Sequence, residues 1–99
     1  MQVVTQSAET VAKETIPTLR FRPEDALLTP AERQVRRFDA ERACALGNNY
    51  HGKLDIYFQT ADGSLKRVQT TVWAVHETYI TLKAGVVLPL NAIVGFDFY

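Results

Sequence analysis

The stretch "VVLPLNAIVGFDFY", Val86 to Tyr99, decides how the chain can fold. Two apolar runs typical of β-strands flank "PLNAI", which is too short for an α-helix and lacks the Asn-Gly or Asp-Gly pair of a tight hairpin. Proline is tolerated at a sheet edge, and the Asn91 side chain can hydrogen-bond local backbone to start a turn. We therefore expect one turn of 3₁₀ helix between the last two strands.

Upstream of this stretch, residues alternate between apolar and polar with a period of two, which predicts three more strands. The first is "KLDIYFQT", and an Asp62-Gly63 turn follows it. The second, "LKRVQTTVWAV", is long for so small a chain, so we expect it to bend. The third is "YITLK". Together with the two C-terminal runs, the pattern predicts five antiparallel strands.

A helix is predicted directly ahead of the strands, in "TPAERQVRRFDAERACALGNN". Thr29 is placed as the N-cap, Pro30 as the first helical residue, and Glu32 as the partner that completes a capping box. Gly47 is expected to end the helix in the left-handed conformation. One apolar stripe at helical spacing is expected to face the core. It consists of Ala31, Val35, Phe38, Ala45 and Leu46.

Residues 1–28 have a different character from the rest of the chain. They are rich in Thr, Glu, Gln and Arg, and Pro17 and Pro23 prevent one continuous helix. We interpret them as a flexible or loosely packed tail, which Leu19 and Phe21 anchor to the domain. The predicted domain is then residues 29–99, a helix followed by a small β-structure.

The order of helix, three strands, two strands and a one-turn helix before the last strand resembles that of SH3-like barrels and their Sm-like relatives. The layout is similar to the small Rho-inhibitor proteins of bacteria. The resemblance covers residues 29–99 and lies in element order and hydrophobic spacing. It implies a mainly β (α+β) fold, in which the helix precedes a five-stranded, strongly bent antiparallel barrel.

The RNA-binding motifs of the Sm-like family are not matched in this sequence. In "VHETYITL", His76 stands where the family has an acidic residue, and Tyr79 stands near its base-contacting asparagine. The basic pair of the second motif would fall in "LPLNAI", which contains no charge. Both departures disfavour RNA binding of the family's type.

The composition is that of one ordinary globular domain, with 46% hydrophobic residues in 99. Lys and Arg total 11, as do Asp and Glu, so the strongly basic balance typical of nucleic-acid-binding proteins is absent. The N-terminus lacks the pattern of a signal peptide, and no run of 18 apolar residues occurs, which predicts no membrane segment. The single cysteine, Cys44, agrees with a reducing compartment, and we expect a cytoplasmic protein.

Catalytic patterns are sparse, and we expect a protein that is not an enzyme. Cys44 and His51 form the one nucleophile-base pair close in sequence, with Asp55 as a candidate to orient the histidine. A buried, inert Cys44 is the favoured interpretation. Neither a CxxC nor an HxxxH spacing occurs, so no metal site and no cofactor is expected.

The aromatic residues carry the functional hypothesis. Strand alternation turns Tyr57, Trp73 and Tyr79 away from the predicted interior. The helix stripe, the tail or a dimer partner would cover them in one interpretation. In the other they form a platform for a protein or peptide partner, because exposed Trp and Tyr combine apolar area with a hydrogen-bonding tip. We therefore predict a non-enzymatic binding or adaptor module, and homo-oligomers are compatible with this prediction.

An RNA- or nucleoprotein-binding Sm-like domain is the alternative. Tyr57 or Trp73 would stack on bases, and five basic residues would contact phosphates. These are Arg33, Arg36, Arg37, Lys66 and Arg67. Glu32 lies four residues before Arg36, and Glu41 lies four after Arg37. This spacing favours a solvated face crossed by ion pairs over a phosphate-binding patch.

Overall fold

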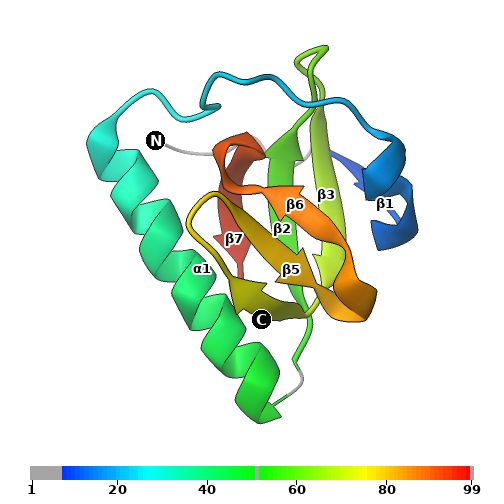
Figure 1. The fold of residues 1–99 in the computed structure, drawn as a ribbon, viewed down its shortest axis with the longest axis vertical. Coiled ribbons are helices and arrows are strands. Elements are labelled where there is room, and N and C mark those ends of the chain that lie inside the picture. Colours follow the sequence, from blue (N-terminus) through cyan, green and yellow to red (C-terminus); the bar gives the residue numbers. More distant parts are fainter. Residues whose placement is uncertain (1–7, 51, 99) are drawn as a thin grey trace.

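The computed structural model describes residues 8–50 and 52–98, except for the side chains of residues 49 and 50. This part of the chain is mixed α+β, with one α-helix and seven strands in two sheets (Figure 1). In chain order the elements are β1 (Glu9–Val11), η2 (Lys13–Thr18), α1 (Pro30–Tyr50), β2 (Leu54–Gln59), β3 (Leu65–Thr70), β4 (Val72–Val75), β5 (Tyr79–Leu82), η3 (Lys83–Gly85), β6 (Val87–Pro89), η4 (Leu90–Ala92) and β7 (Ile93–Asp97), where η marks a 3₁₀ helix.

The strands form two separate sheets. Sheet A has the strand order β1-β3-β2-β7, and sheet B has the order β4-β5-β6. Neighbouring strands are antiparallel except for β1, which runs parallel to β3. The predicted five-stranded barrel is not confirmed, because the described strands do not close into one hydrogen-bonded barrel.

The sheets separate at Thr71, in the middle of the long strand predicted from the sequence. Thr71 is buried, and its carbonyl accepts a hydrogen bond from the Lys83 amide at 3.0 Å. Its hydroxyl donates to the Gly52 carbonyl at 3.3 Å. These contacts replace strand pairing at this residue, so that β3 stays in sheet A and β4 enters sheet B.

The predicted one-turn helix before the last strand is present as η4. It carries the chain from β6 in sheet B to β7 in sheet A, and Leu90 and Ala92 are buried. The Asn91 side chain does not cap the turn as expected. Instead its Nδ2 donates to the Pro23 carbonyl at 2.9 Å, which fastens the N-terminal segment to η4.

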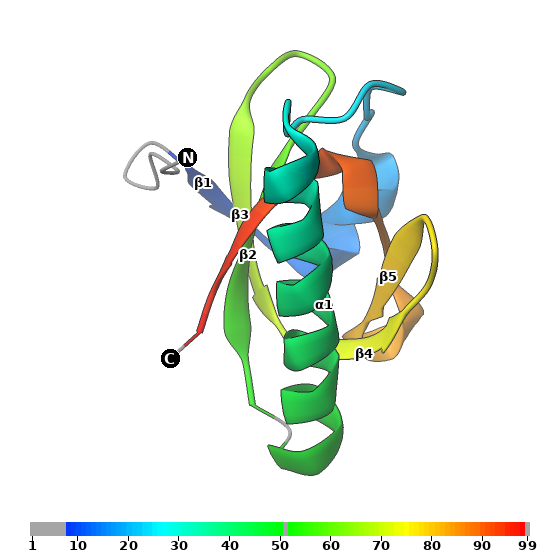
Figure 2. The ribbon, with the colours of Figure 1, turned by 90° about the vertical axis from the view of Figure 1, so that its left-hand side faces the viewer.

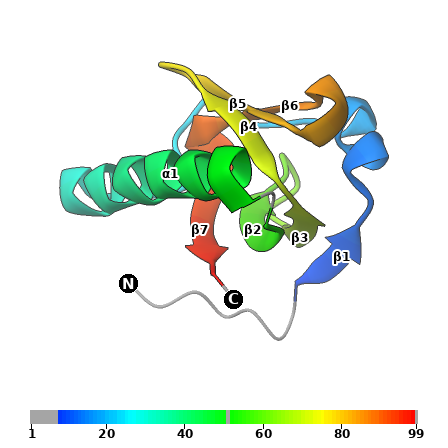
Figure 3. The same ribbon diagram turned by 90° about the horizontal axis from the view of Figure 1, so that it is seen from below.

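The core lies between the two sheets. Sheet A contributes Ile56, Phe58 and Val68, and sheet B contributes Ile80, Leu82 and Leu88, all fully buried. Seen from below, α1 lies at one side of the sheets and the segment of β1 and η2 lies at the other (Figure 3). The two segments therefore complete the core that the sheets leave open.

The described part of the expected tail, residues 8–28, packs onto this core. β1 pairs with β3, and Ile16 of η2 is fully buried. Leu19 and Phe21 pack against the core, as predicted from the sequence. The Phe21 and Phe58 ring centroids are 6.1 Å apart. Residues 8–28 thus share one hydrophobic core with the rest of the described chain.

The start of α1 agrees with the sequence, whereas its end does not. The Thr29 Oγ1 atom accepts a hydrogen bond from the Glu32 amide at 3.2 Å, and Glu32 Oε1 accepts one from the Thr29 amide at 3.3 Å, which completes the capping box. The helix does not stop at Gly47 but continues to Tyr50. A Cβ atom at Gly47 would overlap the Val72 carbonyl oxygen and lie 2.8 Å from Thr71 Cγ2. This glycine serves the close approach of α1 to β4.

The buried face of α1 is not the one that the apolar pattern predicts. The face against the sheets is formed by Arg36, Ala40, Ala43 and Gly47 (the inner face). Val35 and Phe38, expected in the core, are 60% and 67% exposed. Figure 2 shows α1 running along the side of the molecule, between β7 on one side and β4 and β5 on the other.

Candidate functional site

The outer face of sheet B is the first candidate site. Ile80 and Leu88 form a register pair that points into the core, so the neighbouring pairs point outward. One outward pair joins Tyr79 to Pro89, and the other joins Thr81 to Val87. We refer to Trp73, Tyr79, Val87 and Pro89 as the sheet B platform.

Trp73 reaches this face through a β-bulge. Val72 is paired with Leu82 and Ala74 with Thr81, so the register shifts between Val72 and Ala74. Because Val72 is buried and the bulge sets Trp73 beside Ala74, the indole lies on the outward side of β4. Trp73 is 47% exposed, and its carbonyl accepts a hydrogen bond from Cys44 Sγ at 3.5 Å. The partial burial expected from the sequence is therefore found, but Phe38 of the predicted helix stripe is itself exposed.

Tyr79 is held by its neighbours. Its ring stacks on His76 with centroids 4.3 Å apart and planes 22° apart. The His76 Nε2 atom lies 3.3 Å from Thr81 Oγ1, and the His76 amide donates to the Tyr79 carbonyl at 2.8 Å. These contacts fix both rings at the end of the β4-β5 hairpin. A fixed aromatic ring loses little conformational entropy when a partner binds.

Tyr57 does not belong to the platform. It is 4% exposed, which fits the interpretation in which packed structure covers it and not the one in which it forms an exposed platform. It lies on β2, the strand between β3 and β7, with Arg67 and Gly95 as its register partners. Residues on both faces of β2 are buried, so alternation along this strand does not indicate exposure.

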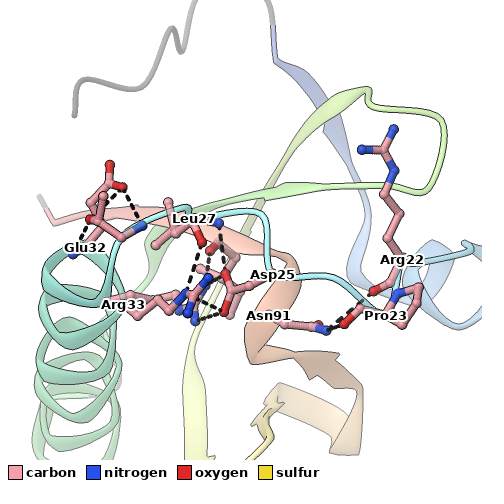
Figure 4. Close-up of polar contacts among 10 residues, drawn as sticks. Arg22, Pro23, Asp25, Leu27, Glu32, Arg33 and Asn91 are labelled. Carbon is pink, nitrogen blue, oxygen red and sulfur yellow. Dashed lines mark hydrogen bonds and ion pairs between the residues drawn. The ribbon is translucent and has the colours of Figure 1, made fainter.

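The basic residues proposed for phosphate contact all have partners within the chain. Arg36 is 8% exposed and donates to both Asp25 carboxylate oxygens, at 2.8 and 2.7 Å, and to the Ile93 carbonyl at 3.0 Å. Arg33 donates to the Leu27 carbonyl at 3.0 Å and lies 3.4 Å from Asp25 Oδ2. Figure 4 shows Asp25 and Leu27 facing Arg33 across the junction between the loop and α1.

The other three cations are engaged on different elements. Arg37 donates to the His76 carbonyl at 2.8 Å and lies 3.9 Å from Glu41, the predicted i,i+4 partner. Lys66 forms an ion pair with Glu9, its register partner on β1. Arg67 donates to Thr10 Oγ1 at 2.9 and 2.6 Å. The five side chains therefore do not form one basic patch.

Asp25 is the polar residue that the sequence analysis missed. It accepts hydrogen bonds from two Arg36 nitrogens and from the Leu27 amide. Burial alone would raise the pKa of the Asp25 carboxyl, but its hydrogen bonds to Arg36 and Leu27 and the charges of Arg36 and Arg33 lower it overall. Since its strongest partner lies 11 residues away across a loop, helical spacing gives no signal for it.

A groove of about 300 Å³ is the second candidate, and it lies between α1 and β7. Apolar side chains of Leu27, Ala31, Val35 and Val94 line it, and Glu32 and Asp39 add acidic groups. We refer to it as the α1-β7 groove. The groove and the sheet B platform are on different elements, so that they can be tested separately.

Only one member of the candidate nucleophile-base pair lies within the described residues. Cys44 is partly buried, and His51, its proposed base, lies outside the described part of the chain. Within residues 8–50 and 52–98, no group of three His, Cys, Asp or Glu side chains is placed to hold a metal ion.

Comparison with known proteins found no matching family model, curated protein or solved structure. Within the described residues, none of the helices has the length and apolar character needed to cross a membrane.

Proposed function

We propose that the chain is a non-enzymatic protein-binding module, and that the sheet B platform binds an apolar segment of its partner. The observation that carries this proposal is the exposure of Trp73 and Tyr79 on one face of a three-stranded sheet. Tyr and Trp are enriched among the residues that dominate binding energy, because they bury a large apolar area and still hydrogen-bond at the tip. Val87, also exposed, extends the apolar surface onto β6.

The partner would be recognised through side chains rather than by adding a strand to the sheet. β6 is an edge strand of sheet B and ends at Pro89, which has no amide hydrogen to donate. A strand added beside β6 would lack a backbone hydrogen bond at this position. The outer face of the sheet remains available, since Trp73, Tyr79 and Val87 are exposed there.

The RNA-binding alternative has less support. Its five proposed phosphate-binding cations contact Asp25, Glu41, Glu9, Thr10 or backbone carbonyls. Phosphate would have to displace these partners, and for Arg36 it would also have to reach a buried guanidinium. A protein partner requires no such displacement. A cytoplasmic location stays a prediction from the sequence.

The test is a selection from a phage-displayed library of random peptides on the folded protein. Trp73 is the single tryptophan, so a peptide that covers the platform should shift the emission maximum to the blue. The variants Tyr79→Ser and Val87→Ser should lose binding by at least about tenfold, as expected for interface residues. The matched control Val35→Ser, on the exposed face of α1, should bind as the wild type does.

Two results would overturn the proposal. In the first, no peptide is enriched over an unrelated control protein, or the enriched peptides bind Tyr79→Ser as tightly as the wild type. In the second, mixed single-stranded RNA shifts the Trp73 emission and its affinity falls steeply with added salt, which would indicate phosphate contacts.

A further inference from the structure

The face of α1 that points away from the sheets carries a second apolar surface. It consists of Ala31, Val35, Phe38 and Ala45, all exposed, and we refer to it as the outer stripe. The opposite side of the helix packs on the sheets through Ala40, Ala43 and Gly47. A helix that is apolar on two opposite faces is typical of one that packs on two sides. The first partner of α1 is its own domain, so the outer stripe implies a second.

Three residues of the outer stripe are spaced symmetrically about its centre at Phe38. Ala31 precedes Phe38 by seven residues, and Ala45 follows it by seven. Seven residues are close to two helical turns, so the three side chains lie on one line along α1. If two such helices pack antiparallel about an axis through Phe38, Ala31 of each helix meets Ala45 of the other. Small residues at both ends let the helices approach, while the two Phe38 rings meet at the centre.

Polar groups beside the outer stripe fit the same arrangement. Gln34 precedes Phe38 by four residues, and Glu41 follows it by three, so both lie on one flank of the stripe. In a two-fold symmetric antiparallel pair, the same flank of each helix lies against that of its partner. The Gln34 amide of one helix therefore lies beside the Glu41 carboxylate of the other. Arg42 interrupts the stripe in sequence, but its guanidinium lies 4.2 Å from the centroid of the Phe98 ring. This contact within the chain draws the Arg42 guanidinium away from the centre of the outer stripe, toward the side of α1 that faces β7.

The α1-β7 groove continues this apolar surface. Ala31 and Val35 belong to both, and Val94 extends the groove onto β7. Stable interfaces bury roughly 800 Å² on each partner, more than a narrow helix stripe offers alone. The groove beside the stripe supplies additional area for a second copy.

We infer that α1 is a self-association surface, at which two copies of the chain pair through their outer stripes with antiparallel helices and a two-fold axis at Phe38. A symmetric dimer requires one patch to be complementary to itself, and the spacing about Phe38 meets this requirement. An unrelated partner would require no such symmetry. The dimer uses α1 and leaves the sheet B platform free, so it does not depend on the proposed function.

The first experiment is sedimentation equilibrium on the full chain, from low micromolar to near-millimolar concentration. The mass should rise from 11.1 kDa toward twice that value. Phe38→Glu places two carboxylates together at the axis and should weaken association by at least about 100-fold. Because Phe38 is exposed in the monomer, the variant should fold normally, which its circular dichroism at low concentration checks. The control Leu28→Glu changes an exposed apolar residue outside the stripe and should leave the mass of the dimer unchanged.

The second experiment tests the orientation by disulfide cross-linking in a Cys44→Ser background. A mixture of Ala31→Cys and Ala45→Cys proteins should form mixed cross-linked dimers, whereas each protein alone should not. A parallel pair would give the reverse result and overturn the arrangement. A wild type that stays monomeric at all concentrations would overturn the inference and leave the stripe to a different protein. A dimer that Phe38→Glu leaves intact would overturn it as well.

Discussion

The two faces of α1 differ in a way that explains much of the structure. The inner face presents Ala40, Ala43 and Gly47 to the sheets, whereas the outer stripe presents Val35 and Phe38 to solvent. In most amphipathic helices the large apolar side chains face the core. Here the backbone of β4 comes so close to α1 that no Cβ atom fits at Gly47. Close packing thus requires small residues on the inner face. The large apolar residues Val35 and Phe38 lie on the outer stripe, where they do not contribute to this packing.

The inner face also contains a charge, which requires its own compensation. Arg36 is buried there, and Asp25 from the preceding loop holds its guanidinium with two hydrogen bonds. The Ile93 carbonyl at the start of β7 accepts a third. A buried guanidinium without such partners would destabilise the fold. The loop before α1 is therefore as important to the inner face as the helix itself.

Removing the partner of Arg36 is the strongest way to disturb the inner face. Asp25→Asn should lower the free energy of unfolding at neutral pH by about 3 kcal/mol, because it leaves the buried guanidinium without its counter-charge. Urea denaturation measures this loss. The matched control Glu24→Gln, which neutralises an exposed carboxylate next in sequence, should change stability by less than about 0.5 kcal/mol.

The same pair predicts a pH dependence. The pKa of Asp25 is lowered in the folded state, so the stability it provides is present above the ordinary carboxyl pKa and is lost as pH falls through the lower folded value. The difference in stability between the wild type and Asp25→Asn should therefore shrink in acid, since a protonated Asp25 resembles the Asn variant. A difference that stays constant from neutral pH to about pH 3 would contradict this account of the pair.

Adding one methyl group to the inner face should have the next largest effect. Gly47→Ala should lower the free energy of unfolding by about 2 kcal/mol, because the new Cβ would overlap the Val72 carbonyl. Helix propensity alone predicts a gain of about 1 kcal/mol. The reverse change on the outer stripe, Ala45→Gly, should cost only this propensity of about 1 kcal/mol. A stabilised Gly47→Ala protein in thermal unfolding would show that the close approach to β4 is not required.

Removing the helix cap should affect both faces alike. Thr29→Ala deletes the hydroxyl that accepts a hydrogen bond from the Glu32 amide and should cost about 1 kcal/mol in a denaturant titration. Thr29→Ser keeps a hydroxyl at this position and should retain most of the stability. Equal stabilities for the wild type and the Ala variant would mean that the capping box does not hold the start of α1.

Truncating the outer stripe should have the smallest effect on the monomer. The apolar pattern alone predicts that Phe38→Ala costs about 3 kcal/mol, as a core truncation would. Since Phe38 is 67% exposed, we expect a change of less than about 0.5 kcal/mol at low micromolar concentration, with no shift in Trp73 emission. A loss near 3 kcal/mol would show that Phe38 is covered within a single chain.

Local signals in the sequence predicted those parts of the fold that depend on neighbouring residues. The Thr29-Glu32 capping box and the one-turn helix η4 both satisfy backbone groups within a few residues, so a short window contains the information. A bend in the long strand was predicted but its position at Thr71 was not, because alternation continues through this residue and the contacts that separate the strands come from Gly52 and Lys83. The parallel pairing of β1 likewise joins distant segments and leaves no local pattern.

For the candidate site, too, the sequence predicted what depends on neighbouring residues and not what depends on distant contacts. Alternation turned Trp73 and Tyr79 away from the core, and they are 47% and 36% exposed because each lies on a strand with one free face. Whether Tyr57 is covered could not be predicted, because β2 is buried on both faces, and that depends on how the sheet is covered. The stripe of α1 was assigned to the wrong side, since periodicity finds an apolar face but not what it contacts. Asp25, which pairs with Arg36, lies on a loop where no spacing rule applies.

The parallel strand β1 has a consequence for the order in which the chain folds. Among the strands that the structure describes, β1 pairs with the outer edge of β3 alone, and the Lys66-Glu9 contact joins residues 57 positions apart. β3 must therefore be in place before β1 can find its partner, and closing so long a loop costs more entropy than forming the β2-β3 hairpin. With a span of Glu9–Val11, β1 has few hydrogen bonds to offset that cost. We expect it to join last during folding and to open first in the native protein, so its amide hydrogens should exchange before those of β2 and β3.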